Sequence, residues 1–304
     1  MGPSDRSYKC AALRSVWIYV ALLSHSFYST EAKDIESFQN ATPIRYKPKL
    51  ESLYKLVLAL LEENQSNPST ENIQKSSSEL NTTGLSGRYP SHCPTYPSAH
   101  GIYTVQVLGL EPFQVSCDAE IAGTGWTVMA RRTSNKLNFF RSWAEYKNGF
   151  GQLDGDFFIG LDKLHAITKS QPHELYIHLE DFEGQTRYAH YDEFFVESEN
   201  KFYAMTKLGG FTGDAGDSMM HNRNQNFSTF DRDNDGWHKN CAEEYVGAWW
   251  HVNCTYSNLF GIYVKGDEGQ YFQWKGIVWH SWRTESYSYK VMQMMVRPKC
   301  YCSR

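Results

Sequence analysis

The sequence predicts a domain that mixes β-strands with short helices, over roughly residues 91–299, behind a looser N-terminal arm. Segments typical of strands, rich in β-branched and aromatic residues, recur through the first half of this region. Aromatic residues make up 15% of the chain and crowd after residue 100, which is enough to fill one substantial core. Gly, Asp, Asn and Trp are dense after residue 209, and no long repeat survives there. This last part is therefore predicted to be rich in loops.

The elements follow from local pattern. Predicted strands cover 101–107 and 113–118, joined by a Gly-Pro turn, and then 125–132, 174–180, 186–196 and 201–206. Predicted helices cover 142–146 and 160–168. Leu175, Ile177 and Leu179 alternate with polar residues, as in a half-buried strand. Loops from 209 to 286 are expected to be held by a bridge and a metal ion rather than by strand pairing, and such regions usually carry the ligand site.

Residues 1–26 have the pattern of a secretory signal peptide. Lys9 and Arg14 precede the apolar run 16–23, and small residues follow it. A signal anchor is the alternative, but a membrane helix needs about 20 apolar residues and this run is shorter. No other segment has the length and apolarity to insert into a membrane. We therefore expect a secreted, extracellular protein.

Residues 27–90 form the arm. Within 49–65, leucine and valine recur at spacings of three and four, which predicts an apolar stripe on a short helix. Pairing of such helices in a short coiled coil would make a homo-oligomer; docking of the helix on its own domain is the alternative. The rest of the arm, rich in Ser and Asn, predicts a flexible linker. Residues 300–304 form a tail in which Cys300 and Cys302 lie too close for an unstrained mutual bond, which leaves an interchain bridge or another pairing.

The remaining cysteines predict disulfides. Removal of residues 1–26 removes Cys10, one of seven cysteines, and leaves six. An even number in a secreted chain is typical of disulfide bonds, although sequence alone does not fix the pairing. Proximity favours Cys93 with Cys117 and Cys241 with Cys254. Zinc binding is the alternative, but the chain has no zinc-finger spacing and no H-E-x-x-H motif.

Five asparagines begin an N-x-[ST] sequon, the acceptor motif for N-linked glycans. They are Asn40, Asn64, Asn81, Asn226 and Asn253. We expect glycans on the three in the arm and on Asn226. Asn253 is followed by a cysteine that we expect to be bridged, which argues against its use.

Residues 231–236, Asp-Arg-Asp-Asn-Asp-Gly, are the most informative motif. Alternating carboxylates on a short loop supply the anionic oxygens that Ca²⁺ prefers, and a Cys241–Cys254 bridge would hold that loop. An EF-hand is one alternative, but its twelfth position requires Glu and falls on Ala242. A solvated acidic turn is the other. The crowding of tryptophans and cysteines around the loop favours the calcium site.

Charge and motifs exclude several functions. The formal net charge is −4 and the Lys and Arg residues are scattered, so we expect no nucleic-acid partner and no anionic membrane surface. The sequence has no G-x-S-x-G, no metalloprotease helix and no glycine loop for phosphate. We therefore do not expect an enzyme.

Ordered strings over residues 91–299 resemble the fibrinogen C-terminal-like domains of ficolins, tachylectins and angiopoietin-like secreted proteins. They include Phe113-Gln-Val-Ser-Cys-Asp118, Gly125-Trp-Thr-Val128, Trp143-Ala-Glu-Tyr146, Phe227-Ser-Thr-Phe230 and Gly247-Ala-Trp-Trp250. The resemblance implies an α+β fold with a small N-terminal subregion, a central twisted antiparallel sheet and a loop-rich lobe that binds calcium and ligand. It also implies the two disulfides favoured by proximity.

The same resemblance implies the metal ligands. Ca²⁺ would be held by the side chains of Asp233 and Asp235, the main-chain carbonyls of Trp237 and Lys239, and water. Asp231 would lie behind these ligands without touching the ion.

The resemblance further implies a pocket for an acetyl group beside the calcium loop. Tyr245 and Tyr271 would wall the methyl group, and a cis peptide bond would turn the Cys254 N–H toward the carbonyl oxygen, next to residue 255. Calcium would shape this pocket without touching the sugar.

The chain departs from the lectin pattern at three positions. Thr255 stands where lectin members have His, Phe260 where they have Asn, and Glu285 near a further aromatic wall. The loop around Tyr271 is also about two residues longer. The favoured function is a calcium-dependent lectin that recognises acetylated glycans, as in innate immunity. The alternative is an angiopoietin-like ligand of a cell-surface protein receptor, in which the sugar pocket is vestigial.

Overall fold

The structure is a computed structural model that describes residues 89–267 and 269–299. The predictions for the signal peptide, the arm helix and the Cys300 and Cys302 tail lie outside these residues. The predicted glycans on Asn40, Asn64 and Asn81 lie outside them too. Among the described residues, no helix has the length and apolar character that crossing a bilayer requires.

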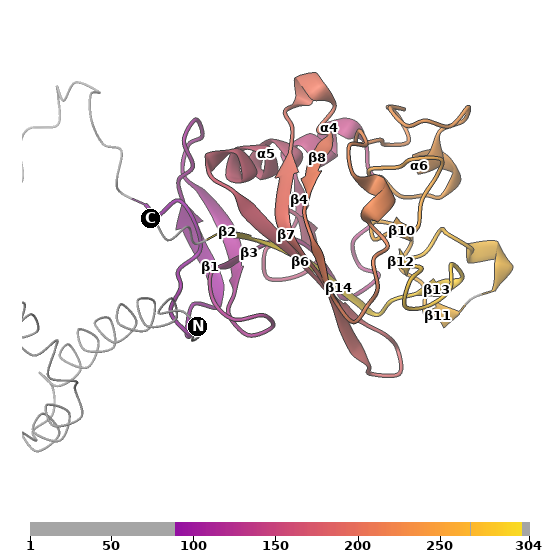
Figure 1. The fold of residues 1–304 in the computed structure, drawn as a ribbon, viewed down its shortest axis with the longest axis horizontal. Helices are drawn as coiled ribbons and strands as arrows, with labels where there is room; N and C mark the ends of the chain where they lie inside the picture. Colours follow the sequence, from indigo (N-terminus) through magenta and orange to yellow (C-terminus); the bar gives the residue numbers. More distant parts are fainter. Residues whose placement is uncertain (1–88, 268, 300–304) are drawn as a thin grey trace, which may run out of the picture. The chain divides into compact units, whose positions relative to one another are not determined.

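One large sheet organises the domain (Figure 1). Its strands are β1 (Gly101–Val105), β2 (Phe113–Asp118), β3 (Trp126–Arg132), β4 (Phe150–Gly151), β5 (Phe157–Phe158), β6 (His173–Glu180), β7 (Thr186–Val196), β8 (Met205–Leu208), β9 (Phe211–Gly213) and β14 (Val291–Pro298). The order through the sheet is β1-β2-β3-β14-β6-β7-β8, with β5 between β3 and β4, and β9 paired to β7. All these pairs are antiparallel.

The remaining elements are short. The helices are α4 (Trp143–Asn148), α5 (Leu161–Ser170), α6 (Cys241–Glu244) and the 3₁₀ helices η2 (Glu199–Lys201), η3 (Met220–Asn222) and η4 (Gln270–Phe272). Two small ladders pair β10 (Ser257–Asn258) with β12 (Val278–Trp279) and β11 (Gly266–Asp267) with β13 (Tyr287–Ser288). We call residues 209–286 the loop lobe. It lies at one end of the domain in Figure 1, and β1 to β3 lie at the other.

Most predicted elements form within one or two residues of their expected bounds, but the strand predicted over 201–206 is wrong. Residues 199–201 form η2, and Phe202 and Tyr203 take left-handed backbone angles, with φ of 52° and 47°. Pairing with β7 therefore begins only at Met205.

The central strand β14 was not predicted. It pairs with β3 on one side and with β6 on the other, and Met292 to Val296 are all buried. A strand buried on both faces has no alternation of apolar and polar residues, so periodicity gives no signal there.

Helix α4 begins with a capping box. The Ser142 hydroxyl accepts a hydrogen bond from the Glu145 N–H, and the Glu145 carboxylate accepts one from the Ser142 N–H. The Trp143 N–H instead donates to the Asp231 carboxylate at 2.9 Å. A residue of the acidic loop therefore satisfies a free donor at the start of a helix that lies 88 residues earlier in the chain.

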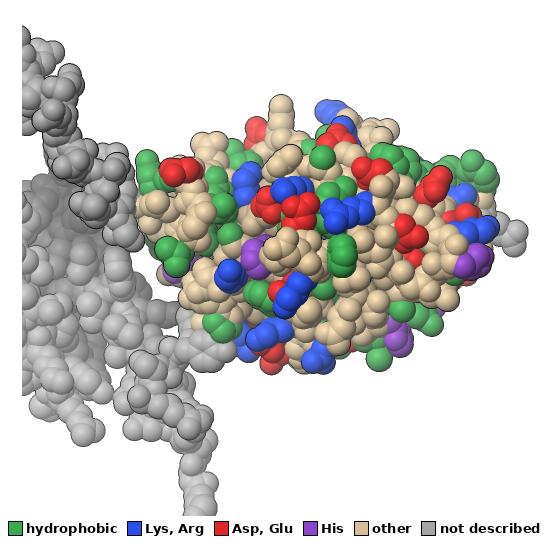
Figure 2. All heavy atoms as spheres, turned by 90° about the horizontal axis from the view of Figure 1, so that it is seen from above, with side chains coloured by type: hydrophobic (Ala, Val, Ile, Leu, Met, Phe, Trp, Pro, Cys, Tyr) green, Lys and Arg blue, Asp and Glu red, His purple; other side chains and the backbone are tan. Residues whose placement is uncertain are grey.

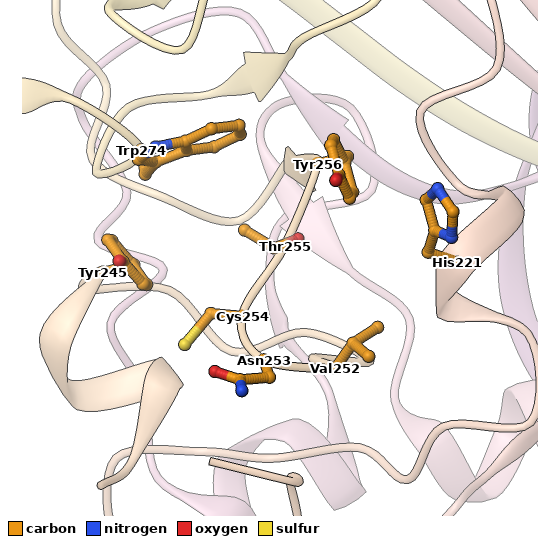
Figure 3. A pocket seen from close by; sticks show the side chains of 8 residues that line it. All are labelled: His221, Tyr245, Val252, Asn253, Cys254, Thr255, Tyr256 and Trp274. Carbon is orange, nitrogen blue, oxygen red and sulfur yellow. The ribbon is translucent and has the colours of Figure 1, made fainter.

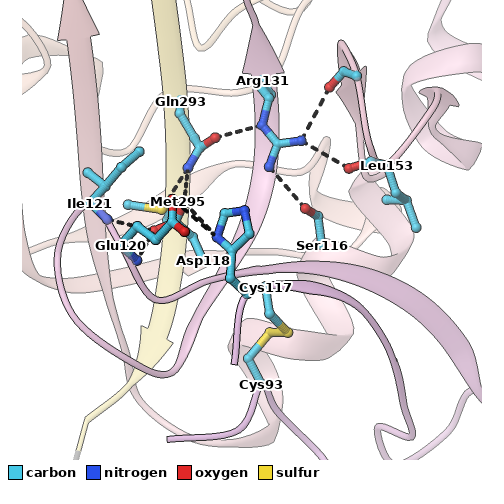
Figure 4. A network of polar contacts seen from close by, with 12 residues as sticks. Cys93, Ser116, Cys117, Asp118, Glu120, Ile121, Arg131, Leu153, Gln293 and Met295 are labelled. Carbon is cyan, nitrogen blue, oxygen red and sulfur yellow. Dashed lines mark hydrogen bonds and ion pairs between the residues drawn. A yellow bond between two sulfur atoms is a disulfide. The ribbon is translucent and has the colours of Figure 1, made fainter. Parts of the chain in front are cut away.

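A polar network joins the N-terminal strands to β14 (Figure 4). Arg131 donates to the Gln293 carbonyl oxygen at 2.7 Å and to the Ser116 hydroxyl at 3.0 Å. Gln293 in turn donates to the Asp118 carboxylate at 3.1 Å. Because β2, β3 and β14 share this network, the first strands are fixed to a strand near the end of the chain.

Aromatic packing joins the loop lobe to the sheet. Phe260 is fully buried, and its ring lies 5.3 Å from that of Phe158, 4.9 Å from Trp249 and 5.7 Å from both Phe139 and Tyr146, measured between centroids. These rings come from α4, β5 and three loops. Phe260, one of the departures from the lectin pattern, is therefore a core residue.

Charges are mixed on the surface. Figure 2 shows Lys and Arg side chains interspersed with Asp and Glu over the face seen from above, with no large area of one sign. This face offers no electrostatic footprint for a polyanion.

His173 gives the fold a predicted sensitivity to acid. It begins β6, is 2% exposed, and donates from Nδ1 to the Gln171 carbonyl at 2.7 Å. Burial lowers its pKa to about 4, from about 6.5 in the unfolded chain. A lowered pKa stabilises the neutral folded form fully above pH 6.5, and this contribution is lost as the pH falls toward 4. We expect about 3 kcal/mol of unfolding free energy to be lost in this window.

The measurement is urea unfolding at several pH values between 7 and 4. In His173→Gln, which keeps a donor but does not titrate, the fall in stability should be smaller by about that amount. An unchanged pH slope in the variant would assign the acid sensitivity to other groups.

Candidate functional site

The acidic loop, residues 231–239, folds around its own carboxylates. The Asp233 carboxylate accepts a hydrogen bond from the Asp235 N–H at 3.1 Å. The Asp235 carboxylate accepts one from the Trp237 N–H at 2.8 Å and one from the Cys241 N–H at 2.9 Å. Such turns hold the carboxylates close together without neutralising their charge. We call this segment the cation loop.

The oxygen atoms of the cation loop fit a hard cation. Burial raises the pKa of Asp235; the two N–H donors counter this effect, and the adjacent Asp233 charge adds to it. Within the described part of the chain, no N–H or O–H group donates to the main-chain carbonyl of Trp237 or Lys239. Two carboxylates and two free carbonyls are the oxygen donors that Ca²⁺ prefers.

Main-chain oxygens are essential to any such site. Over residues 89–267 and 269–299, no three His, Cys, Asp or Glu side chains converge as a metal cluster. A cation in the loop would therefore depend on the two carbonyls and on water as well as on the two carboxylates.

Asp231 has a different role from Asp233 and Asp235. One of its carboxylate oxygens accepts both the Trp143 N–H, at 2.9 Å, and the Thr229 hydroxyl, at 2.7 Å. These bonds tie the cation loop to α4 and direct this carboxylate toward the protein. That Asp231 lies behind metal ligands stays a prediction, and these bonds show only that one of its oxygens is already used within the protein.

The cation loop is bonded to the segment 252–255. The Gly236 N–H donates to the Val252 carbonyl at 3.0 Å. The Cys241–Cys254 disulfide forms a second link, with Cα atoms 5.6 Å apart. A change in the shape of the cation loop would therefore be transmitted to residues 252–255.

The other predicted disulfide, Cys93–Cys117, forms in the N-terminal subregion, with Cα atoms 5.7 Å apart.

Residues 252–255 form one wall of a pocket of about 360 Å³ (Figure 3). Half of the eight lining side chains carry an aromatic ring, and none carries a carboxylate or ammonium group. They are His221, Tyr245, Val252, Asn253, Cys254, Thr255, Tyr256 and Trp274. In Figure 3 Tyr245 and Trp274 lie on one side of the segment 252–256, and His221 lies on the other.

Asn258 positions two of these aromatic residues. Its amide nitrogen donates to the Tyr245 carbonyl at 2.9 Å and to the Trp274 carbonyl at 2.8 Å. Asn258 is fully buried, so the donor of both bonds is shielded from water. Tyr245 itself follows α6, and burial raises the pKa of its phenol. One buried amide therefore sets the separation of two pocket walls.

The pocket presents free main-chain donors. The Asn253–Cys254 peptide bond is cis, as the resemblance implies. No acceptor among the described residues takes the N–H of Cys254 or of Thr255. The Thr255 hydroxyl is engaged in a turn, where it donates to the Ser257 carbonyl and accepts the Ser257 N–H at 3.1 Å. Two neighbouring amides are thus available to a carbonyl or an anionic oxygen.

Two residues expected at the pocket lie elsewhere. Tyr271 is 75% exposed and does not line the pocket; its ring lies beside Lys275 and Phe272. Trp274 takes the wall position instead, because η4 ends at Phe272 and Trp274 then turns back with a φ of 64°. Glu285 is also outside the lining and accepts a hydrogen bond from Gln273 at 2.8 Å. The carboxylate therefore does not face the ligand space.

The structure brings Tyr245, Cys254 and Thr255 together in one pocket, where their role in ligand binding stays a prediction; sequence reasoning missed His221, Tyr256 and Trp274 as lining residues. Tyr256 follows Thr255 directly, and that adjacency was a usable signal. The other two come from distant loops, for which the sequence holds no spacing rule.

The fold and the pocket together define a fibrinogen-like globular domain. Residues 95–299 match the family described as fibrinogen beta and gamma chains, C-terminal globular domain, and the chain belongs to that family.

Its relatives include fibrinogen C domain-containing protein 1. The mouse protein is 43% identical over 191 residues, which is 61% of this chain and 41% of that protein. The Xenopus tropicalis protein is 42% identical over 205 residues, 66% of this chain and 44% of that protein. The chain therefore spans about two fifths of the length of the curated relatives it matches.

Solved structures with the same fold include the fibrinogen-like globe domain of human ANGPTL2, at 35% identity and a TM-score of 0.65, over 69% of this chain and 100% of that one. The fibrinogen-like globe domain of human ANGPTL6 is 36% identical with a TM-score of 0.66, over 73% of this chain and 100% of that one. Lamprey fibrin D-dimer in complex with the peptide Gly-His-Arg-Pro-amide is 25% identical with a TM-score of 0.64, over 96% of this chain and 98% of that one.

Proposed function

We propose that this protein is a secreted calcium-dependent recognition protein that binds acetylated carbohydrate in the pocket between Tyr245, Cys254 and Trp274. The observation that carries the proposal is the combination of aromatic walls with two free neighbouring amides, beside an oxygen-rich loop. An acetamido group needs these two features: an apolar surface for its methyl group and N–H donors for its carbonyl oxygen.

Each part of the pocket has a distinct task. Tyr245 and Trp274 would contact the methyl group and the apolar face of the sugar ring. The Cys254 and Thr255 amides would donate to the acetyl oxygen. Calcium, when bound by Asp233 and Asp235, would neutralise the loop and hold its shape; the Gly236 bond and the disulfide would pass that order to the amides.

A small open pocket binds one sugar weakly. Linking several such pockets on an oligomer raises apparent affinity by about 10²–10⁴ without any new contact. The helix predicted over residues 49–65 would supply that oligomer.

The second candidate is an angiopoietin-like ligand of a cell-surface protein receptor. The ANGPTL2 and ANGPTL6 globe domains share the fold, and lamprey fibrin D-dimer is described in complex with a peptide ligand. In that function the loop lobe would present a protein-binding face, and the pocket would be vestigial.

The test is retention of the oligomeric protein on an acetylated resin in calcium, followed by elution with a chelator. Trp274→Ala should reduce retention about tenfold or more, since loss of about 1.4 kcal/mol of contact energy corresponds to tenfold in affinity. Tyr271→Ala is the matched control, because that aromatic ring lies outside the pocket, and retention should not change.

Absence of retention in calcium, both for the wild-type oligomer and for Asn253→Gln, which lacks the sequon in the pocket wall, would reject the lectin proposal. A screen of cell-surface proteins with the same sample would then test the receptor-ligand alternative directly.

A further inference from the structure

One lining residue of the pocket is itself the acceptor of a sequon. Asn253-Cys254-Thr255 fits N-x-[ST], and all three residues line the pocket. We propose that Asn253 carries an N-linked glycan that covers the pocket, so that the protein exists in a closed glycosylated form and an open unmodified form. The effect on ligand binding rests on the proposed function; the glycan and its position do not.

The Asn253 side chain is free to carry a glycan. It is exposed, and its amide makes no hydrogen bond with any described residue. The other sequon of the loop lobe differs. Asn226 is half-buried, and its amide nitrogen, the atom to which a glycan attaches, donates to the Asn234 carbonyl at 3.3 Å. The exposed Asn253 amide, which has no hydrogen-bond partner among the described residues, is therefore favoured over Asn226 as a glycan acceptor. The sequence alone led to the opposite expectation.

The hydroxyl residue of the sequon is Thr255, a position at which the chain departs from the lectin pattern. In the folded protein its hydroxyl is engaged in a turn with Ser257. Thr255 therefore makes Asn253 an acceptor, and its hydroxyl already has partners within the protein.

The chemistry of attachment is a transfer from a lipid diphosphate oligosaccharide. The bond between the anomeric carbon of the first sugar and the diphosphate oxygen breaks, and a bond from that carbon to Asn253 Nδ2 forms. The amide proton is released, and the lipid diphosphate is the leaving group. The first sugar would then lie one residue from the Cys254 amide, within the wall of the pocket.

The position of attachment decides the consequence. The pocket measures about 360 Å³, and Asn253 lies in its wall beside Val252 and Cys254. A branched oligosaccharide is much larger than this space. A second sugar from solution cannot occupy the pocket while the first sugars of the attached glycan cover its opening. Modification of Asn253 would therefore act as a mask on the recognition site.

The test uses the full chain secreted from animal cells. Mass mapping of peptides should show a glycan on Asn253 in the wild type and in Thr255→Ser, which keeps the sequon. No glycan should be found there in Asn253→Gln or Thr255→Val, which remove it by two different routes. An unmodified Asn253 in the secreted wild-type protein would overturn the proposal.

Accessibility of the pocket is read without any ligand by hydroxyl-radical footprinting of Tyr256, which is 48% exposed in the unmodified chain. Oxidation of Tyr256 should rise several-fold in Asn253→Gln and in Thr255→Val relative to the wild type. Oxidation of Tyr271, which is 75% exposed and lies outside the pocket, should stay constant and is the control for the radical dose. Equal oxidation of Tyr256 with and without the glycan would overturn the mask.

Retention on acetylated resin then separates the two proposals. Asn253→Gln should be retained at least tenfold better than wild type, and Asn81→Gln, which removes a sequon of the arm, should behave as wild type. If Asn253→Gln gains Tyr256 oxidation but neither protein is retained in calcium, the lectin function fails and the covering glycan stands.

Discussion

Replacing Asp233 and Asp235 together by Asn should abolish calcium uptake, and replacing Asp231 alone should not. The reason is the division of labour among the three carboxylates. Burial raises the pKa of Asp235 and the neighbouring Asp233 charge adds to the rise, an electrostatic penalty that a divalent cation relieves. The Asp231 carboxylate instead accepts hydrogen bonds from the Trp143 N–H and the Thr229 hydroxyl.

Calorimetric titration and thermal unfolding measure this effect. Calcium at about 100 times its dissociation constant should stabilise the wild type by about 2.7 kcal/mol, and the double variant by nothing. Asp231→Asn should keep the heat of calcium binding but lose about 1 kcal/mol of stability, because it weakens the bonds at the start of α4. Loss of calcium binding in Asp231→Asn to the same degree would instead make Asp231 a direct ligand, as in an EF-hand. Absence of any binding heat in the wild type would reject the metal site.

The double variant also tests the coupling between loop and pocket. The only bonds that carry the state of the cation loop to residues 252–255 within the described structure are the Gly236 to Val252 bond and the Cys241–Cys254 bridge. If these bonds transmit order, chelation should raise oxidation of Tyr256 in Asn253→Gln. Chelation should have no such effect when Asp233 and Asp235 are also replaced by Asn, since that protein binds no calcium that a chelator could remove.

Sequence pattern located the strands whose signal is local. β7 has the predicted bounds because buried residues nearly alternate with more exposed ones along it, and β2 has them because turn residues precede it. The pattern did not predict β14, because both faces of this strand are covered. The prediction of a strand over 201–206 was wrong because Phe202 and Tyr203 take left-handed backbone angles. Those backbone angles depend on packing, and neither residue type favours them.

The candidate site divides in the same way. The cation loop is contiguous, so its acidic character and its bridge could be named from spacing, whereas the choice of carboxylates and carbonyls as ligands came from the resemblance and stays a prediction. The pocket is assembled from the distant segments that contribute His221, Tyr245 and Trp274, and the buried Asn258 amide fixes two of them. The resemblance placed Tyr271 on the wall, but Trp274 lines the pocket instead, because the chain turns back after η4. Such a turn decides which side chain lines a cavity, and residue identity alone does not report it.

Phe260→Ala should produce the largest loss of stability among single substitutions considered for this domain. The Phe260 side chain is fully buried against Phe139, Phe158 and Trp249, rings that belong to both the loop lobe and the sheet. Truncation of a buried Phe costs about 3–5 kcal/mol, because the surroundings do not collapse fully into the space left. Native domains have about 5–15 kcal/mol of total stability, so the loss is a large fraction of it.

Guanidinium unfolding in the presence of calcium measures this loss as a lower midpoint at constant slope. Tyr271→Ala, at a 75% exposed position, should change stability by no more than about 0.5 kcal/mol and is the matched control. Phe260→Asn, which restores the residue of the lectin pattern, should be worse than alanine, since it also buries an amide among aromatic rings without partners. If Phe260→Asn were instead as stable as wild type, the rings around it would have to leave room for water or a polar partner. The aromatic contact between sheet and loop lobe would then not be what holds the pocket in place.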